Sequence, residues 1–145
     1  MKERIEEARR LAMEFHDGQV DKAGVEYIKH PDYVAEHVET DAEKIVAYLH
    51  DILEDTECPR ATIKKMFGDE ILEAVVAMTH IKGEDYFDYV RRAAQNPISR
   101  NVKKADLTHN MMIERIPNPT RKDYQRLEKY KKAMMIIEEM ETQRI

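Results

Sequence analysis

Apolar residues recur every three or four positions along most of the chain, and strict alternation of apolar and polar residues is missing. This spacing puts apolar side chains on one face of an α-helix, whereas a half-buried strand needs a period of two. We therefore predict an all-α fold, a compact bundle of about eight helices. The expected helices are 2–15, one opened by His30 and Pro31, one beginning after Thr40, 61–67, 69–80, 84–94, one from Pro97 that ends before Pro117, and a long helix after Thr120.

Residues with known capping preferences set several helix ends. Thr40 and Glu43 have the spacing of a capping box. Asn96 precedes Pro97 as a cap precedes a first-turn proline, and Gly68 suits a left-handed C-terminal cap. The last helix carries an apolar stripe that we interpret as packing surface, together with the methionines at 134, 135 and 140. The stripe consists of Tyr124, Leu127, Tyr130, Met134 and Ile137.

The size and charge of the chain narrow the classes of protein to consider. A length of 145 residues suits one domain, 1–145, with its own core. No apolar run approaches the ~18 residues of a membrane span, and the charged start "MKERIEEARR" is unlike a signal peptide. The single cysteine, Cys58, excludes an intramolecular disulfide, so we expect a cytoplasmic protein. A net charge of -5 argues against nucleic acid as a partner and leaves a local basic patch or a metal to hold any anion.

The stretch "YLHDILEDTE" combines a polar cluster with an apolar helix face. His50, Asp51, Glu54 and Asp55 fall on the arc opposite the apolar residues. One interpretation is a solvated outer face, which amphipathic helices commonly have. The other is a metal site, because a divalent cation would remove the repulsion between the carboxylates. The apolar face consists of Ala42, Ile45, Val46, Leu49, Ile52 and Leu53.

Further ligands for a metal stand elsewhere in the sequence. His30 precedes the second helix, and Asp106 lies in "VKKADLTHN". Each alone would more commonly be an exposed polar residue. Lys103, Asp106 and Asn110, however, are spaced i, i+3, i+7 and share one helix face. Two imidazoles and two carboxylates form a mixed nitrogen and oxygen set that suits manganese, iron or magnesium better than a thiolate zinc site.

Several motifs resemble one known family. The order "FHDGQ", "YIKHP", "LHDILEDT", "FGDEI" and "VKKADLTHN", over residues 8–111, is similar to that of the HD-domain hydrolases of the RelA/SpoT type, in particular the small stand-alone guanosine tetraphosphate hydrolases. The resemblance implies a helical bundle that removes pyrophosphate from the 3′ position of (p)ppGpp. It implies one Mn²⁺ ion, with Mg²⁺ or Fe²⁺ as alternatives, bound by His30, His50, Asp51 and Asp106. It also implies that Glu54 and Asp55 position and activate the attacking water.

Substrate-binding residues are expected near the same motifs. Phosphate charge needs cations, and the resemblance implies a nucleoside pocket, so we expect this role for His16, Lys22, Tyr27, Lys82, Lys103 and Asn110. The family usually has Arg-Lys where this chain has Asp21 and Lys22, and the anion at 21 should weaken the binding of a polyphosphate. Two alternatives therefore stay open: an HD-superfamily phosphohydrolase or phosphodiesterase for another nucleotide, and a nucleotide-binding HD module without turnover.

Overall fold

The computed structural model describes residues 2–21 and 23–143 and confirms the all-α prediction. The described residues form no named strand, and Val20 and Glu26 make an isolated antiparallel bridge in the loop between the first two helices. The elements are α1 (Lys2–Phe15), α2 (Lys29–Glu36), α3 (Asp41–Leu49), α4 (Ile52–Asp55), α5 (Arg60–Phe67), α6 (Asp69–Ala77), α7 (Tyr86–Gln95), α8 (Pro97–Asn110), the 3₁₀ helix η1 (Ile113–Arg115) and α9 (Arg121–Gln143). No helix among these residues is long and apolar enough to cross a membrane.

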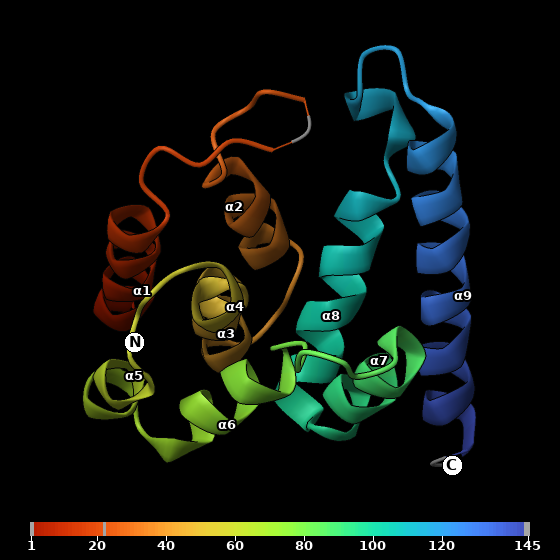
Figure 1. The fold of residues 1–145 in the computed structure, drawn as a ribbon. Coiled ribbons are helices and arrows are strands. Elements are labelled where there is room, and N and C mark those ends of the chain that lie inside the picture. The colour runs from red at the N-terminus through yellow and green to blue at the C-terminus, as the bar shows by residue number, and fades with distance from the viewer. Residues whose placement is uncertain (1, 22, 144–145) are drawn as a thin grey trace.

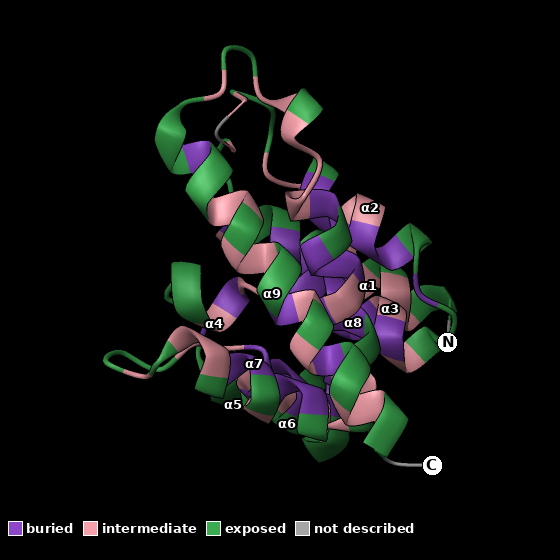
Figure 2. Ribbon diagram, turned by 90° about the vertical axis from the view of Figure 1, so that its right-hand side faces the viewer, coloured by how far each residue is buried: buried purple, intermediate pink, exposed green. Residues whose placement is uncertain are grey.

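Helix α8 lies in the middle of the molecule, between α2 and α3 on one side and α9 on the other (Figure 1). Val102 and Ala105 of α8 belong to the larger apolar cluster, which includes buried residues of α1, α2, α3, α5 and α6. Leu107 of α8 belongs to the smaller cluster, which includes α7 and α9. Buried residues gather around α8, whereas α9 is mostly exposed or partly exposed (Figure 2). A polar residue on the inner side of α8 is therefore held by packing from both sides.

The predicted helix caps at Thr40 and Asn96 are present. Thr40 and Glu43 form the capping box, each side chain accepting a hydrogen bond from the other residue's backbone N–H. The Asn96 side chain accepts hydrogen bonds from the backbone N–H groups of Ile98 and Ser99, at 2.9 and 3.0 Å. Gly68 ends α5 with its N–H donating to the Lys64 carbonyl, but its φ of +92° and ψ of 174° are not those of the predicted left-handed cap; this extended conformation with positive φ is one that residues with a Cβ rarely adopt.

The predicted third helix is divided in two. The prediction of one continuous helix is therefore wrong at His50 and Asp51, two of the candidate metal ligands. Helix α3 ends at Leu49 and α4 begins at Ile52, so His50 and Asp51 lie in the turn between them. The His50 Nδ1 atom lies 2.6 Å from the Ala47 carbonyl oxygen, the acceptor that a continuous helix would use for the Asp51 N–H. The imidazole thus takes over a backbone hydrogen bond at the break.

Other predicted boundaries and faces differ in detail. Helix α2 begins at Lys29, so Pro31 is its third residue; it is still in the first turn, where no N–H is needed. Helix α6 ends at Ala77 rather than at residue 80. Helix α7 begins at Tyr86 rather than at residue 84, because the Asp85 side chain caps it. The predicted packing role is wrong for two residues of α9, Tyr124 and Met135, which are 51% and 62% exposed.

Candidate metal centre and cavity

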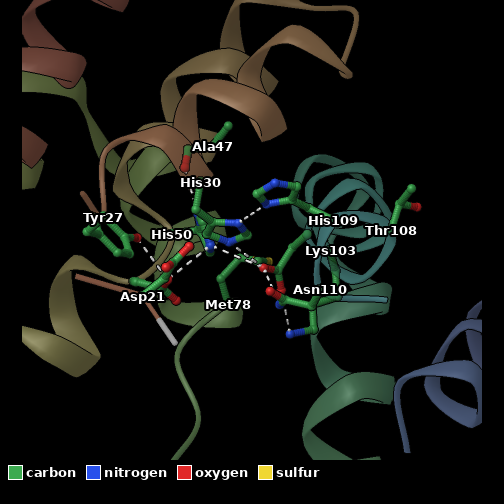
Figure 3. A network of polar contacts seen from close by, with 12 residues as sticks. Asp21, Tyr27, His30, Ala47, His50, Met78, Lys103, Thr108, His109 and Asn110 are labelled. Carbon is green, nitrogen blue, oxygen red and sulfur yellow. Dashed lines mark hydrogen bonds and ion pairs between the residues drawn. The ribbon is translucent and has the colours of Figure 1, made fainter. Parts of the chain in front are cut away.

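His30, His50 and Asp106 form the tightest group of possible metal ligands among the described residues. One side-chain nitrogen or oxygen from each lies within 4.8 Å of those of the other two. Figure 3 shows His30 and His50 facing the side chains that α8 presents, with Lys103 and Asn110 beside them. Asp51 lies next to this group, with its Oδ2 atom 3.2 Å from His50 Nε2. The structure thus brings together the four residues predicted as ligands, from α2, the α3–α4 turn and α8.

The hydrogen bonds on the outer side of the two imidazoles set which nitrogen faces inward. His50 Nδ1 must donate to the Ala47 carbonyl, which has only lone pairs, so the inner Nε2 of a neutral imidazole carries a lone pair. His30 Nδ1 lies 2.7 Å from His109 Nδ1, and its Nε2 lies 2.8 Å from Asp106 Oδ1. Burial, His30 and Arg115 lower the pKa of His109 to about 4, so His109 is neutral near pH 7 and can accept from His30.

The inner nitrogens therefore fit a bound cation. His50 Nε2 is buried and has no hydrogen-bond partner among the described residues. It lies 3.5 Å from Asp106 Oδ1, so nitrogen and oxygen lone pairs face one another. Burial alone would lower the pKa of His50, but the charges of Asp51 and Asp106 outweigh it and raise this pKa well above its usual value. A positive charge is thus favoured where the donor atoms of a metal site converge.

Asp106 is at the centre of a buried charge network on α8. Its Oδ2 atom accepts a hydrogen bond from Lys103 Nζ at 3.0 Å, and its Oδ1 atom accepts one from Asn110 Nδ2 at 3.1 Å. This confirms that the three residues share one face. Burial opposes ionisation, but the Lys103 charge and the two histidines hold the pKa of Asp106 well below its usual range. Asp106 is therefore an anion that is already hydrogen-bonded on both oxygens.

A cavity of about 690 Å³ opens beside this centre. His30, Asp51 and Asp106 line it on the side of the predicted ligands, and α7, η1 and α9 line it elsewhere. Its size is within the range of small-molecule sites, about 300 to 1,000 Å³. A molecule bound in the cavity would therefore contact the candidate metal ligands directly.

The two predicted catalytic carboxylates, Glu54 and Asp55, also line the cavity. Glu54 Oε1 accepts a hydrogen bond from the backbone N–H of His80 at 2.9 Å, which fixes the carboxylate on the cavity side of α4. Burial and the charges of Asp51 and Glu54 raise the pKa of Asp55 to about 6. A carboxylate with this pKa, with access to water beside a cation site, can accept and pass on a proton near neutral pH.

Only some of the predicted substrate-binding residues line the cavity. Tyr27, Lys103 and Asn110 line the cavity, and the Tyr27 hydroxyl donates to Asp51 Oδ2 at 2.8 Å. His16 does not line it, but its ring stacks on that of Tyr27 with centroids 4.0 Å apart. Lys82 is exposed and is not brought to the cavity, because it lies in the α6–α7 loop outside the lining. Lys22 lies outside the described residues.

Much of the cavity wall is formed by residues that were not predicted from the sequence. Arg115 of η1, Lys129 and Tyr130 of α9, and Tyr86 and Tyr89 of α7 all line the cavity. These residues stand outside the recognised motifs, and Tyr130 belongs to the apolar stripe that the sequence indicates as packing surface. His109 had a signal, because it stands three positions after the predicted ligand Asp106 within the motif "VKKADLTHN", but its contact with His30 needs the folded chain.

Comparisons with known proteins agree with this architecture. Residues 8–116 match the family model described as HD domain. The bifunctional (p)ppGpp synthase/hydrolase SpoT of Escherichia coli K12 is 28% identical over 123 residues, which cover 74% of this chain and 18% of that protein. A guanosine-3′,5′-bis(diphosphate) 3′-pyrophosphohydrolase of Aquifex aeolicus is 33% identical over 121 residues, covering 75% of this chain and 17% of that protein. The chain thus spans less than a fifth of the length of these curated relatives.

One solved structure is similar over nearly the whole chain. It was reported as "A metazoan ortholog of SpoT hydrolyzes ppGpp and plays a role in starvation responses". The TM-score is 0.78 at 19% sequence identity, and the match covers 92% of this chain and 84% of the other. At this level of identity the likeness establishes the fold.

Proposed function

Because this chain belongs to the HD domain family, we propose that it is a metal-dependent phosphohydrolase that removes pyrophosphate from the 3′ position of (p)ppGpp-like nucleotides. One observation carries the proposal: two imidazole Nε2 atoms converge on Asp106 at the wall of a cavity that also exposes Glu54 and Asp55. A binding module would have no chemical need for two carboxylates beside the ligand set.

His30, His50, Asp51 and Asp106 are the residues that we propose to hold one divalent ion. Mixed imidazole and carboxylate donors favour Mn²⁺, with Mg²⁺ or Fe²⁺ as alternatives. The ion would supply Lewis-acid activation of a phosphoryl oxygen and of the attacking water. The hydrogen bonds that the outer Nδ1 atoms donate, from His50 to the Ala47 carbonyl and from His30 to His109, fix the orientation of both rings, as hydrogen bonds of metal-bound histidines commonly do.

Glu54 and Asp55 are the proposed acid–base pair. The Glu54 carboxylate is oriented by the His80 N–H and can accept a proton from water at its second oxygen. Asp55, with its pKa raised to about 6, can hold a proton in the same part of the cavity. Tyr27, through its hydrogen bond to Asp51, keeps the Asp51 carboxylate on the cavity side of the turn.

The substrate class is supported by the relatives and by the chemistry of the cavity. The two curated relatives are described as a (p)ppGpp synthase/hydrolase and as a 3′-pyrophosphohydrolase of the same guanosine nucleotide. A nucleotide needs both polar and aromatic contacts, and the cavity offers tyrosine rings from α7 and α9 together with cationic side chains. We therefore propose a guanosine polyphosphate as the substrate.

A turnover assay with a panel of nucleotides tests the proposal against its alternatives. Purified protein with Mn²⁺ is incubated with ppGpp, pppGpp, GTP and a cyclic nucleotide, and the products are separated by ion-exchange chromatography. We expect ppGpp to give GDP and pyrophosphate. Hydrolysis of another nucleotide alone would point to a different HD-superfamily enzyme. Tight nucleotide binding without any turnover would identify a binding module.

A further inference from the structure

Asp21 and Arg115 meet at one edge of the cavity, although 94 positions separate them in the sequence. Arg115 Nη1 lies 3.4 Å from Asp21 Oδ2, and both residues line the cavity. Asp21 belongs to the loop between α1 and α2, and Arg115 is the last residue of η1. Figure 1 shows this loop and the segment after α8 at the same end of the molecule. The Asp21 carboxylate of this loop is therefore paired with the guanidinium of Arg115 from η1.

The Asp21 carboxylate is fixed by its own loop. Its Oδ1 atom accepts hydrogen bonds from the backbone N–H groups of Ala23 and Val25, at 2.8 and 3.0 Å. The backbone of Asp21 also donates to the Val25 carbonyl at 2.8 Å. Asp21 thus closes a turn with one oxygen and presents the other to Arg115. Its position is set by the loop and does not depend on the arginine.

Arg115, in contrast, uses little of its hydrogen-bonding capacity among the described residues. A guanidinium carries five N–H donors, and its contact with Asp21, at 3.4 Å, is near the outer limit for a hydrogen bond. The Nε atom of Arg115 is buried and has no hydrogen-bond partner among the described residues. A buried donor without an acceptor carries a free-energy cost that a bound oxyanion would remove. Phosphate matches the planar fork of a guanidinium with two parallel hydrogen bonds.

We infer that Arg115 binds a phosphate group of the substrate other than the one attacked, and that Asp21 positions it. This inference rests on the proposed function, since it assigns a second phosphate contact to the same cavity. The cation comes from η1, whereas the loop around Asp21 supplies the fixed carboxylate that locates it. A polyphosphate can thus be held at two points, by the candidate metal ligands and by Arg115.

Replacement of Arg115 by glutamine tests the inference, with Arg91→Gln as a matched control. Arg91 also pairs with an aspartate, Asp88, at 3.0 Å, but it is exposed and does not line the cavity. We expect Arg115→Gln to raise KM for ppGpp by about 10- to 100-fold, the effect of losing hydrogen bonds to a charged group. The kcat should stay within about twofold, because a contact with a non-reacting phosphate is the same in the ground and transition states. Arg115→Lys, which keeps the charge but not the fork, should lie between.

A second measurement separates this inference from the proposed function. Binding of inorganic pyrophosphate to the Mn²⁺-loaded full chain is measured by calorimetry for the wild type and the three variants, alongside thermal stability and metal content. Weaker binding in Arg115→Gln alone, at unchanged stability and metal content, supports the inference even if the wild type does not hydrolyse ppGpp. Equal pyrophosphate affinity in the wild type and Arg115→Gln overturns it. The inference is also overturned if Arg115→Gln loses enough stability or metal to explain all of its weaker pyrophosphate binding, since Arg115 would then only join two loops.

Discussion

Replacement of Asp106 by asparagine should destabilise the metal-free protein far more than an exposed substitution of the same kind. The change keeps the shape of the side chain and removes its charge. Lys103 would then remain buried, 6% exposed, with no carboxylate at hydrogen-bond distance. The Tyr89 hydroxyl, 3.2 Å from Lys103 Nζ, is a neutral partner and cannot replace the charge.

We take the size of the effect from a comparison of two ion pairs with the same sequence spacing and distance but different burial. Lys103 with Asp106 and Arg91 with Asp88 are both i, i+3 pairs at 3.0 Å. The side chains of the first pair are 8% and 7% exposed, and those of the second are 51% and 68% exposed. Removing one partner of a buried pair costs about 3 to 5 kcal/mol, whereas an exposed pair contributes about 0 to 1 kcal/mol. We therefore expect a difference of about 3 kcal/mol between Asp106→Asn and Asp88→Asn.

Urea unfolding at pH 7 with a chelator present measures this difference in the free energy of unfolding. The chelator excludes stabilisation by a bound metal. A double variant, Lys103→Met with Asp106→Asn, should recover part of the loss, because no buried charge is left unpaired. Two results would contradict this expectation. One is a free energy of unfolding of Asp106→Asn within about 1 kcal/mol of that of Asp88→Asn. The other is a double variant whose loss of stability equals the sum of the losses of the two single variants.

Two more predictions concern catalysis and the packing of α1. Glu54→Gln should lower turnover by roughly a hundredfold or more while metal content stays stoichiometric, and unaltered turnover would assign the proton transfer to another group. Asp32→Asn should lower the free energy of unfolding by about 1 to 2 kcal/mol, since Asp32 accepts hydrogen bonds from Arg9 at 2.8 and 2.9 Å and from Tyr48 at 2.7 Å. Burial acts to raise the pKa of Asp32, but these hydrogen bonds outweigh it and lower the pKa below 3.8. The stability difference from wild type should therefore be full at pH 7 and shrink as the pH falls below about 4, and a difference independent of pH would contradict the role of the charge.

The helices and the grouping of candidate ligands could be predicted because both depend on local patterns. Apolar spacing and caps such as Thr40 and Asn96 act within a few residues, so they can be read from the sequence. The candidate ligands stand in motifs whose order was recognisable. The break between α3 and α4 was hidden, because the apolar pattern continues past His50 and the hydrogen bond from its ring to the Ala47 carbonyl cannot be read from the sequence.

The opposite wall of the cavity depends on tertiary contacts and could not be predicted. Arg115 and Lys129 are ordinary surface cations by sequence, and only the return of η1 and α9 brings them to the cavity. The contacts of Asp21 were hidden for the same reason. That its charge weakens the binding of a polyphosphate stays a prediction, and the fold adds what the sequence could not show: Asp21 caps a turn and pairs with an arginine 94 positions away.

The most direct test of the central claim combines metal removal with analysis of the product. Protein stripped of metal by a chelator is incubated with ppGpp, before and after one equivalent of Mn²⁺ is restored, alongside an Asp51→Ala variant. We expect GDP and pyrophosphate to form only with the wild type in the presence of Mn²⁺. We expect the Asp51→Ala variant to bind less than one Mn²⁺ per chain. Equal hydrolysis without metal, or full metal binding and full turnover in Asp51→Ala, would contradict the proposed site.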